Sequence, residues 1–286
     1  MYKMSLNNVL IIAKKEFSDL ISNWMMLVVL VSYLVFIGLE TFGYITSFNT
    51  GVPSIVKVFM GDVGAASAYL IYWDLTQFGA IIGVMIGCLS IANERHNNAL
   101  NTLIVKPIFR DTIINGKLLG SVSFLVFIIG FILIIYTSGL LIFLGNQMAP
   151  FIGDYTAKII MIFVLSIVFI LFFFLLSMFI SLVVRNQAFA MILSLIPVYL
   201  SNMVCSSVYA SDMTAALPFG GYIAGLVASV SPTDMLYSLI YGVFRISSPD
   251  VVNTFMIAVP VIVKLLGLSF VICILCYIIF IRRDIT

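Results

Sequence analysis

Charge is scarce in this chain. Only 9% of its 286 residues are charged, whereas about a quarter of a typical soluble domain is charged. Hydrophobic residues make up 63%, so the chain cannot cover itself with a solvated surface. The net charge of +2 is also too small to indicate a nucleic-acid partner. The composition therefore predicts an integral membrane protein.

Groups that support catalysis or bind metals are equally scarce. His96 is the only histidine, so neither a histidine metal site nor a nucleophile with a histidine base can be assembled. Cys273 and Cys276 are spaced as CxxC but lack a second pair or a flanking histidine. No GxxxxGK[ST] phosphate loop is present. We expect a non-catalytic chain that binds no metal or cofactor of its own.

Long apolar runs, by contrast, are abundant. A helix of about 20 residues crosses a hydrocarbon layer of about 30 Å. Six runs reach that length, which predicts an all-α protein with one transmembrane domain over residues 1–286. The predicted spans are 24–43, 75–93, 118–144, 157–184, 188–208 and 257–281.

Residues 7–23, before the first predicted span, have an amphipathic pattern. Lys14 and Lys15 fall on the polar side. Such a helix lies in the membrane interface with its lysines toward lipid headgroups. The apolar residues, spaced by three and four, are Leu10, Ala13, Phe17, Leu20, Ile21 and Trp24.

The basic residues predict the orientation of the spans. Cytoplasmic segments of membrane proteins carry an excess of Lys and Arg. With both termini in the cytoplasm, all but four of the 14 basic residues lie inside; the exceptions are Lys57, Lys158, Arg245 and Lys264. We therefore expect a multi-pass plasma-membrane protein with both ends cytoplasmic.

The outer segment 209–256 contains a stretch, Gly220 to Phe244, that is apolar enough to be mistaken for a seventh span. Its middle reads Ser231-Pro232-Thr233-Asp234. This pattern is typical of a helix start, with Ser231 as N-cap and Pro232 at the first helical position. We expect two short helices here, either re-entrant or on the outer face.

Gly79, Gly83 and Gly87 form a GxxxGxxxG stripe within the second predicted span. Such stripes let another helix approach closely. The partner is either a helix of the same subunit or one at a protomer interface along the transport path. Both readings remain open, and we expect close helix packing beside that path.

The polar, basic segment 94–117 interrupts the apolar sequence. Residues 97–105 can form a short helix that ends before Pro107. Leu100, Leu103 and Ile104 share one side of this helix. An exposed apolar stripe either lies on the lipid surface or docks into a partner's groove.

The segment resembles the membrane subunits of ATP-binding-cassette exporters of the type-2 permease family, with type V architecture. Those proteins carry a glutamate, a Gly-Thr-Leu-Glu sequence, a proline, an arginine and Gly-Lys-Leu at matching spacing, although the Gly-Thr pair and the second glutamate are replaced here. The matching residues of this chain are Glu94, Asn98-Ala99-Leu100-Asn101, Leu103, Pro107, Arg110 and Gly116-Lys117-Leu118.

The resemblance implies that residues 94–117 are a coupling helix that fits a cleft on a separate cytoplasmic ATPase. ATP and Mg would be bound by that partner. Two permease subunits, identical or different, would work with two ATPases. Within the segment, Leu100, Leu103 and Ile104 would supply apolar anchoring, and Glu94 and Arg110 polar contacts, with Asn98 and Pro107 in the same contact region.

Two other functions remain open. A secondary transporter or channel is the first alternative, although the predicted membrane centre is almost free of the ionisable residues that coupled carriers use. A membrane enzyme or assembly scaffold is the second.

Overall fold

The computed structural model describes residues 6–49, 63–96, 110–184, 186–203, 220–239 and 251–282. Every regular element in these ranges is helical, so the all-α prediction is confirmed there. In chain order the helices are α1 (Leu6–Ser22), α2 (Trp24–Asn49), α4 (Val63–His96), α6 (Arg110–Met148), the short 3-10 helix η1 (Ala149–Phe151), α7 (Ile152–Val183), α8 (Gln187–Met203), α10 (Gly220–Val230), α11 (Pro232–Leu239) and α12 (Val251–Arg282).

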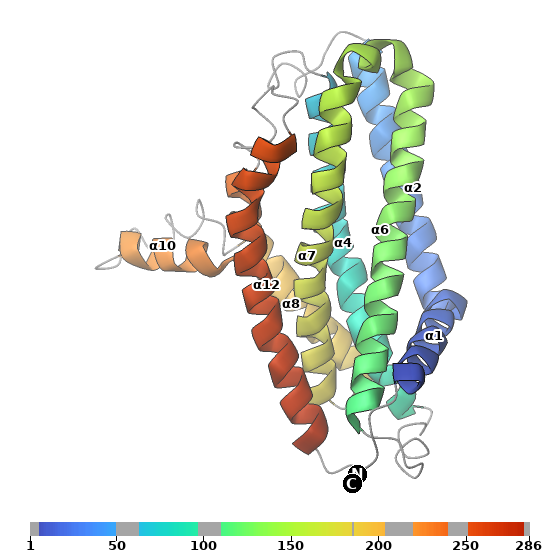
Figure 1. The fold of residues 1–286 in the computed structure, drawn as a ribbon, viewed down its shortest axis with the longest axis vertical. Coiled ribbons are helices and arrows are strands. Elements are labelled where there is room, and N and C mark those ends of the chain that lie inside the picture. Colours follow the sequence, from blue (N-terminus) through green and yellow to red (C-terminus); the bar gives the residue numbers. More distant parts are fainter. Residues whose placement is uncertain are drawn as a thin grey trace.

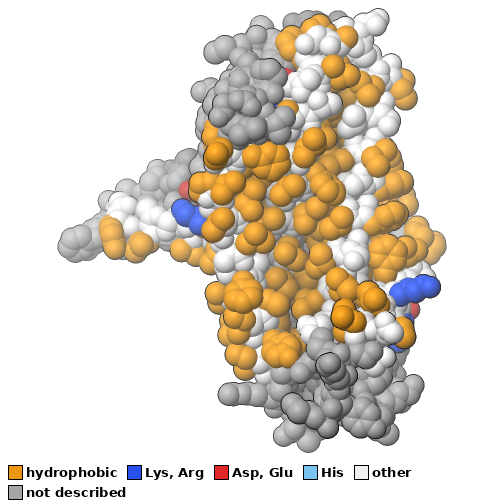
Figure 2. Space-filling view, in the orientation of Figure 1, with side chains coloured by type: hydrophobic (Ala, Val, Ile, Leu, Met, Phe, Trp, Pro, Cys, Tyr) orange, Lys and Arg blue, Asp and Glu red, His pale blue; other side chains and the backbone are white. Residues whose placement is uncertain are grey.

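The long helices stand side by side in an elongated bundle. Figure 1 shows α2, α4, α6, α7 and α12 along its long axis, with α10 projecting to one side. α6 and α7 are antiparallel because η1, which contains Pro150, turns the chain between them. The face shown in Figure 2 carries mostly apolar side chains. Such a surface suits a lipid environment.

The lengths of the apolar helices also fit a membrane protein. Four apolar stretches of the described helices are long enough to cross a bilayer: Trp24–Thr46, Ala66–Ile91, Thr112–Val183 and Phe255–Phe280. The third holds 72 residues and contains most of α6 and all of η1 and α7. The apolar helix Gln187–Asn202 is shorter and covers only part of the predicted span 188–208. The count of six crossings stays a prediction.

α4 and α7 form the centre of the bundle. Leu75 and Ile86 of α4 and Phe173 and Phe174 of α7 are fully buried. α2 and α12 instead expose many large apolar side chains, among them Phe270. The outer helices therefore present lipid-facing surfaces, whereas the α4–α7 pair determines how the bundle is packed.

The short helices α10 and α11 meet at Ser231. The Ser231 Oγ accepts a hydrogen bond of 3.4 Å from the backbone N–H of Asp234, and Pro232 begins α11. A serine N-cap followed by proline is a favoured helix start. The predicted pair of short helices is confirmed, while their depth in the membrane stays a prediction.

A polar network attaches α11 to α4 and α8. Thr233 Oγ1 donates a 2.9 Å hydrogen bond to Asn202 Oδ1, and it lies 2.7 Å from Ser201 Oγ. The Asn202 amide in turn donates to Gln77 Oε1 of α4. Tyr72 of α4 also donates to the Leu236 carbonyl of α11. Side-chain hydrogen bonds of this kind hold helices together where lipid offers no alternative partner.

Replacing Thr233 with valine tests this attachment. The change keeps the side-chain shape but removes the hydroxyl, so we expect a loss of about 1–2 kcal/mol. The loss should be local, with faster hydrogen exchange at the α11 amides. Exchange measured by mass spectrometry in detergent micelles checks this. Ser229→Ala is the control, because the Ser229 hydroxyl donates to the Leu226 carbonyl within α10. Unchanged protection of the α11 amides in Thr233→Val would contradict the assignment.

Candidate functional site

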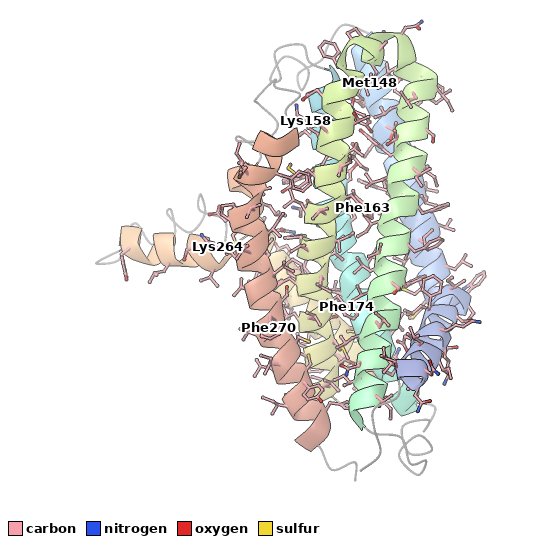
Figure 3. All side chains as sticks on the ribbon, viewed as in Figure 1. Met148, Lys158, Phe163, Phe174, Lys264 and Phe270 are labelled. Carbon is pink, nitrogen blue, oxygen red and sulfur yellow. The ribbon has the colours of Figure 1, made fainter. Side chains whose placement is uncertain are left out.

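One end of the bundle gathers the segments that flank residues 97–109. α4 ends there, α6 begins there, and α12 ends there, with α1 lying alongside (Figure 1). We call this the α1 end. Lys158 of α7 lies near the opposite end (Figure 3). The α1 end is therefore where anything bound to the predicted coupling segment would act on the helices.

The structure places only the edges of that segment. Glu94 falls in the last turn of α4 and Arg110 is the first residue of α6. The other five predicted contact residues lie outside the described residues: Asn98, Leu100, Leu103, Ile104 and Pro107. Their contacts with an ATPase stay a prediction.

A buried ion pair joins three helices at the α1 end. Lys117 Nζ of α6 lies 2.7 Å from Glu16 Oε2 of α1 and donates a 2.6 Å hydrogen bond to the Ser90 carbonyl of α4. Ser121 Oγ donates to the other Glu16 oxygen at 3.5 Å. Lys117 is 1% exposed and Glu16 7%. Charges so buried require such partners. We call Glu16, Lys117 and the Ser90 carbonyl the three-helix clasp.

Two glycines of α6 bring α1 close enough for this pairing. A Cβ added at Gly116 would lie 2.7 Å from the Ile12 side chain, and one at Gly120 would lie 2.6 Å from the Ala13 carbonyl oxygen. Neither position has room for a larger residue without moving α1. The short Glu16 side chain therefore reaches Lys117 because α1 rests almost directly on the α6 backbone.

The buried face of α1 differs from the predicted apolar stripe. Val9, Ala13, Glu16 and Leu20 face inward, whereas Leu10, Ile21 and Trp24 of the predicted stripe are exposed. Ala13 and Leu20 belong to both faces. The faces differ because α1 packs on α6 through the glycines and the ion pair, so Glu16 lies inward and part of the apolar stripe stays exposed. Phe17 is half-buried, and its ring centroid lies 5.6 Å from that of Phe124 and 6.0 Å from that of Phe127.

α1 continues into α2 with a single residue between them. Asn23 caps α2, because its side-chain oxygen accepts a 2.9 Å hydrogen bond from the Met25 backbone N–H. Its carbonyl also accepts from the Leu27 N–H at 3.1 Å. α1 and α2 are therefore joined by a short link whose backbone and side-chain groups are hydrogen-bonded.

The glycine stripe of α4 faces α7 of the same chain. A Cβ at Gly83 would lie 2.7 Å from Ile170 Cγ2 and 2.9 Å from the Ile170 carbonyl oxygen, and one at Gly87 would collide with the Phe174 carbonyl oxygen. The structure thus gives the stripe an intrasubunit partner. Its relation to a transport path stays a prediction.

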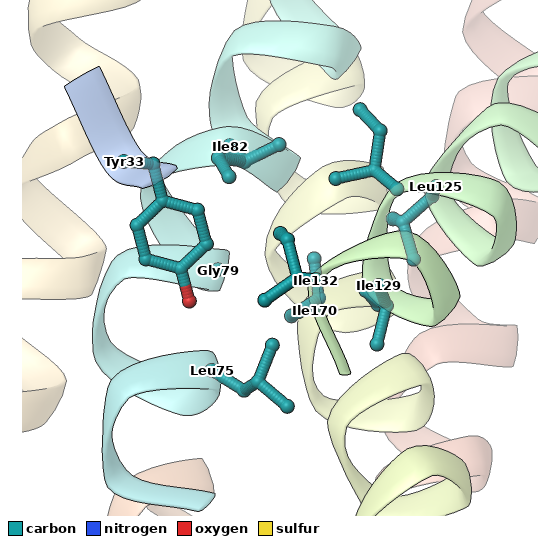
Figure 4. Close-up of a pocket in the computed structure, with 9 residues that line it drawn as sticks. Tyr33, Leu75, Gly79, Ile82, Leu125, Ile129, Ile132 and Ile170 are labelled. Atoms are coloured by element: carbon teal, nitrogen blue, oxygen red, sulfur yellow. The ribbon is translucent and has the colours of Figure 1, made fainter. Parts of the chain in front are cut away.

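A small pocket lies beside Gly79 between α2, α4, α6 and α7 (Figure 4). Its lining is apolar apart from Tyr33, whose hydroxyl donates to the Asp74 carbonyl oxygen. Such a lining suits an apolar group and offers nothing that does acid–base or nucleophilic chemistry. The remaining lining residues are Leu75, Ile82, Leu125, Ile128, Ile129, Ile132 and Ile170.

Metal-binding clusters are also missing from the part of the chain that the structure describes. No group of three or more His, Cys, Asp or Glu side chains gathers there. Cys88, Cys273 and Cys276 are free thiols. The Cys88 Sγ–H donates a 3.4 Å hydrogen bond to Ser194 Oγ, which joins α4 to α8.

The family profile described as ABC-2 family transporter protein matches residues 10–285. The chain belongs to this ABC-2 transporter family. A comparison with curated proteins finds no match. ABC-2 permeases are multi-pass membrane components of ATP-binding-cassette transporters, and membership implies association with an ATP-binding-cassette ATPase. The predicted resemblance is therefore confirmed at the level of the family.

The three-helix clasp of this ABC-2 permease was missed by the sequence analysis. Lys117 was counted among the cytoplasmic basic residues and noted within the Gly-Lys-Leu match, and Glu16 was placed on neither side of the amphipathic helix. The sequence did contain a signal for this buried pair. Glu16 lies on the same side of the helix as Val9 and Ala13, since these three residues follow one another at spacings of four and three. A charge at the centre of an otherwise apolar face indicates a buried partner.

Proposed function

We propose that this chain is the permease subunit of an ATP-binding-cassette exporter. It crosses the membrane six times with both termini in the cytoplasm, and it works as a dimer with a second permease and two cytoplasmic ATPases. ATP and Mg bind to the ATPases and not to this chain. The substrate is moved outward through helices whose surfaces are mostly apolar.

The family match over residues 10–285 carries this proposal. Two further observations support it. This sequence contains no phosphate loop, which fits ATP hydrolysis by a partner chain. The ends of α4 and α6 that flank the coupling segment are also joined at the α1 end through Lys117 and the Ser90 carbonyl. A partner bound between them would act on both helices.

Residues 94–117 are the proposed contact with the ATPase. Leu100, Leu103 and Ile104 anchor the segment in an apolar groove, and Glu94 and Arg110 make polar contacts at its edges. Asn98 and Pro107 belong to the same contact region. Burying one leucine contributes about 1.5–3 kcal/mol, so each anchor matters for affinity.

Leu103→Asp tests this contact. A carboxylate in an apolar groove loses the leucine contribution and adds a desolvation penalty, so we expect ATPase binding to weaken about tenfold or more. The measurement is the amount of ATPase that co-purifies with tagged permease from cells expressing both chains.

Ile152→Asp is the matched control, because Ile152 is a half-exposed apolar residue at the opposite end, where α7 begins. It should retain the ATPase. Co-purification that is equal in Leu103→Asp and wild type would contradict the role of the segment. Failure of the wild-type permease to retain any ATPase would contradict the proposed function itself.

A further inference from the structure

The three-helix clasp differs from the second buried ion pair of the described residues. Lys158 and Asp154 are four residues apart on α7, so their pairing joins no helices. Glu16 and Lys117 are 101 residues apart and lie on α1 and α6, and Ser90 adds α4. The clasp therefore constrains the relative position of three helices, which the α7 pair cannot do.

The clasp also sits at both edges of the coupling segment. Ser90 lies four residues before Glu94, and Lys117 ends the segment. One ammonium group thus connects the C-terminal part of α4 to the N-terminal part of α6. Through Glu16 the same group reaches α1, which leads into α2 by the short link at Asn23.

Charged hydrogen bonds have a preferred direction, which apolar contacts between helices lack. Apolar packing is non-directional, so it fixes the relative position of two helices only through the shape of the packed side chains. The 2.7 Å and 2.6 Å bonds of Lys117 are directional and tie it to defined atoms of α1 and α4. A buried ion pair adds little net stability over apolar residues of similar size, so stability alone does not explain this pair.

We propose that Glu16 and Lys117 are positioning residues that keep α1 docked on α6 and α4 while an ATPase displaces the coupling segment. The three helix ends then move as one unit, and α2 follows through Asn23. This inference rests on the proposed function, because it requires an ATPase acting on residues 94–117.

The test is a distance measurement between α1 and α6 through the ATPase cycle. Spin labels are placed on Leu6 and Ile134, which are exposed residues of the two helices, after the native cysteines are replaced by alanine. Distances are measured by pulsed electron resonance in the full complex, without nucleotide and after trapping with ATP and orthovanadate. In the wild type we expect the same narrow distribution in both states.

The variant Glu16→Met/Lys117→Met removes the charges but keeps apolar side chains of similar length, so the fold is retained. We expect its distribution to broaden and to shift on trapping. Glu16→Gln, which keeps the shape and one amide oxygen, should show a smaller broadening. The matched control is Asp154→Met/Lys158→Met, which removes the α7 pair and should behave as wild type.

Two results would overturn the inference: a wild-type distance that changes on trapping, or paired-methionine and Glu16→Gln variants that match the wild type in both states. Both presuppose a complex that binds the ATPase and traps nucleotide. If the wild-type permease forms no such complex, the proposed function fails and the inference fails with it. The outcomes therefore separate the two claims.

Discussion

Replacing Gly87 with alanine is expected to destabilise the bundle by about 3 kcal/mol. The new Cβ would collide with the Phe174 carbonyl oxygen and lie 3.0 Å from the Met178 amide nitrogen, and both atoms belong to the α7 backbone. A backbone cannot rotate away as a side chain can, so α4 and α7 would have to separate. This pair forms the centre of the packing, so the strain would reach the whole molecule.

The three glycines of the stripe should differ in a defined order. At Gly79 the obstruction is the end of the flexible Ile170 side chain, so Gly79→Ala should lose only about 1 kcal/mol. Gly83 faces both the Ile170 side chain and its carbonyl oxygen, so its alanine variant should fall between the other two. The measurement is thermal unfolding in detergent. Unfolding is monitored by the reaction of the Cys88 and Cys276 thiols, which are buried in the folded protein, with a maleimide dye.

Gly38 and Gly139 provide the controls. Both lie inside apolar helices, and a Cβ added at either meets no atom within 4 Å. Alanine there should leave stability unchanged or raise it by about 0.5–1 kcal/mol, because glycine lowers helix stability. A Gly87→Ala protein as stable as these controls would show that α4 and α7 are not in the close contact described.

The positions of the long helices could be predicted from the sequence because they follow from composition. An apolar run of about 20 residues must be helical in lipid, where every backbone group needs an internal partner. The break at Ser231 was equally predictable, since a serine followed by proline specifies a helix start locally. These features need only information from neighbouring residues.

The three-helix clasp could not be predicted in the same way. Glu16 and Lys117 are 101 residues apart, and nothing in the pattern around either residue specifies the other. Periodicity identified the apolar side of α1 but not which side packs on protein, since lipid and protein both accept apolar groups. The inward face was decided by Gly116 and Gly120, whose lack of side chains leaves room for α1.

The partner of the glycine stripe was undetermined for a related reason. A stripe of small residues indicates that another helix approaches closely, but it does not identify that helix. Ile170 and Phe174 of α7 fill the surface beside Gly79, Gly83 and Gly87. The glycine stripe is therefore not available to a second copy of this chain, because a direct α4–α4 contact through the glycines would displace α7.

Replacing Lys117 alone with methionine should be among the most damaging single changes at the α1 end. It leaves the Glu16 carboxylate, 7% exposed, without the ammonium that neutralises it. Removing one partner of a buried ion pair typically lowers stability by about 3–5 kcal/mol, whereas replacing both with apolar residues is often neutral. Glu16→Met/Lys117→Met should therefore recover most of the loss. A double-mutant cycle from unfolding midpoints in detergent measures both effects.

Lys158→Met is the matched control for this cycle. Lys158 is as buried as Lys117, but the side chain of its partner Asp154 is 12% exposed, against 8% for the Glu16 side chain. The α7 pair also lies within one helix near the end of the bundle. A carboxylate closer to solvent is less destabilised by losing its partner, so the loss should be smaller than for Lys117→Met. A paired methionine variant no more stable than Lys117→Met would mean that the junction depends on the specific hydrogen bonds of Lys117 and not on charge balance. Equal stability of Lys117→Met and wild type would instead show that Glu16 is accessible to water, which contradicts the packing of α1 on Gly116 and Gly120.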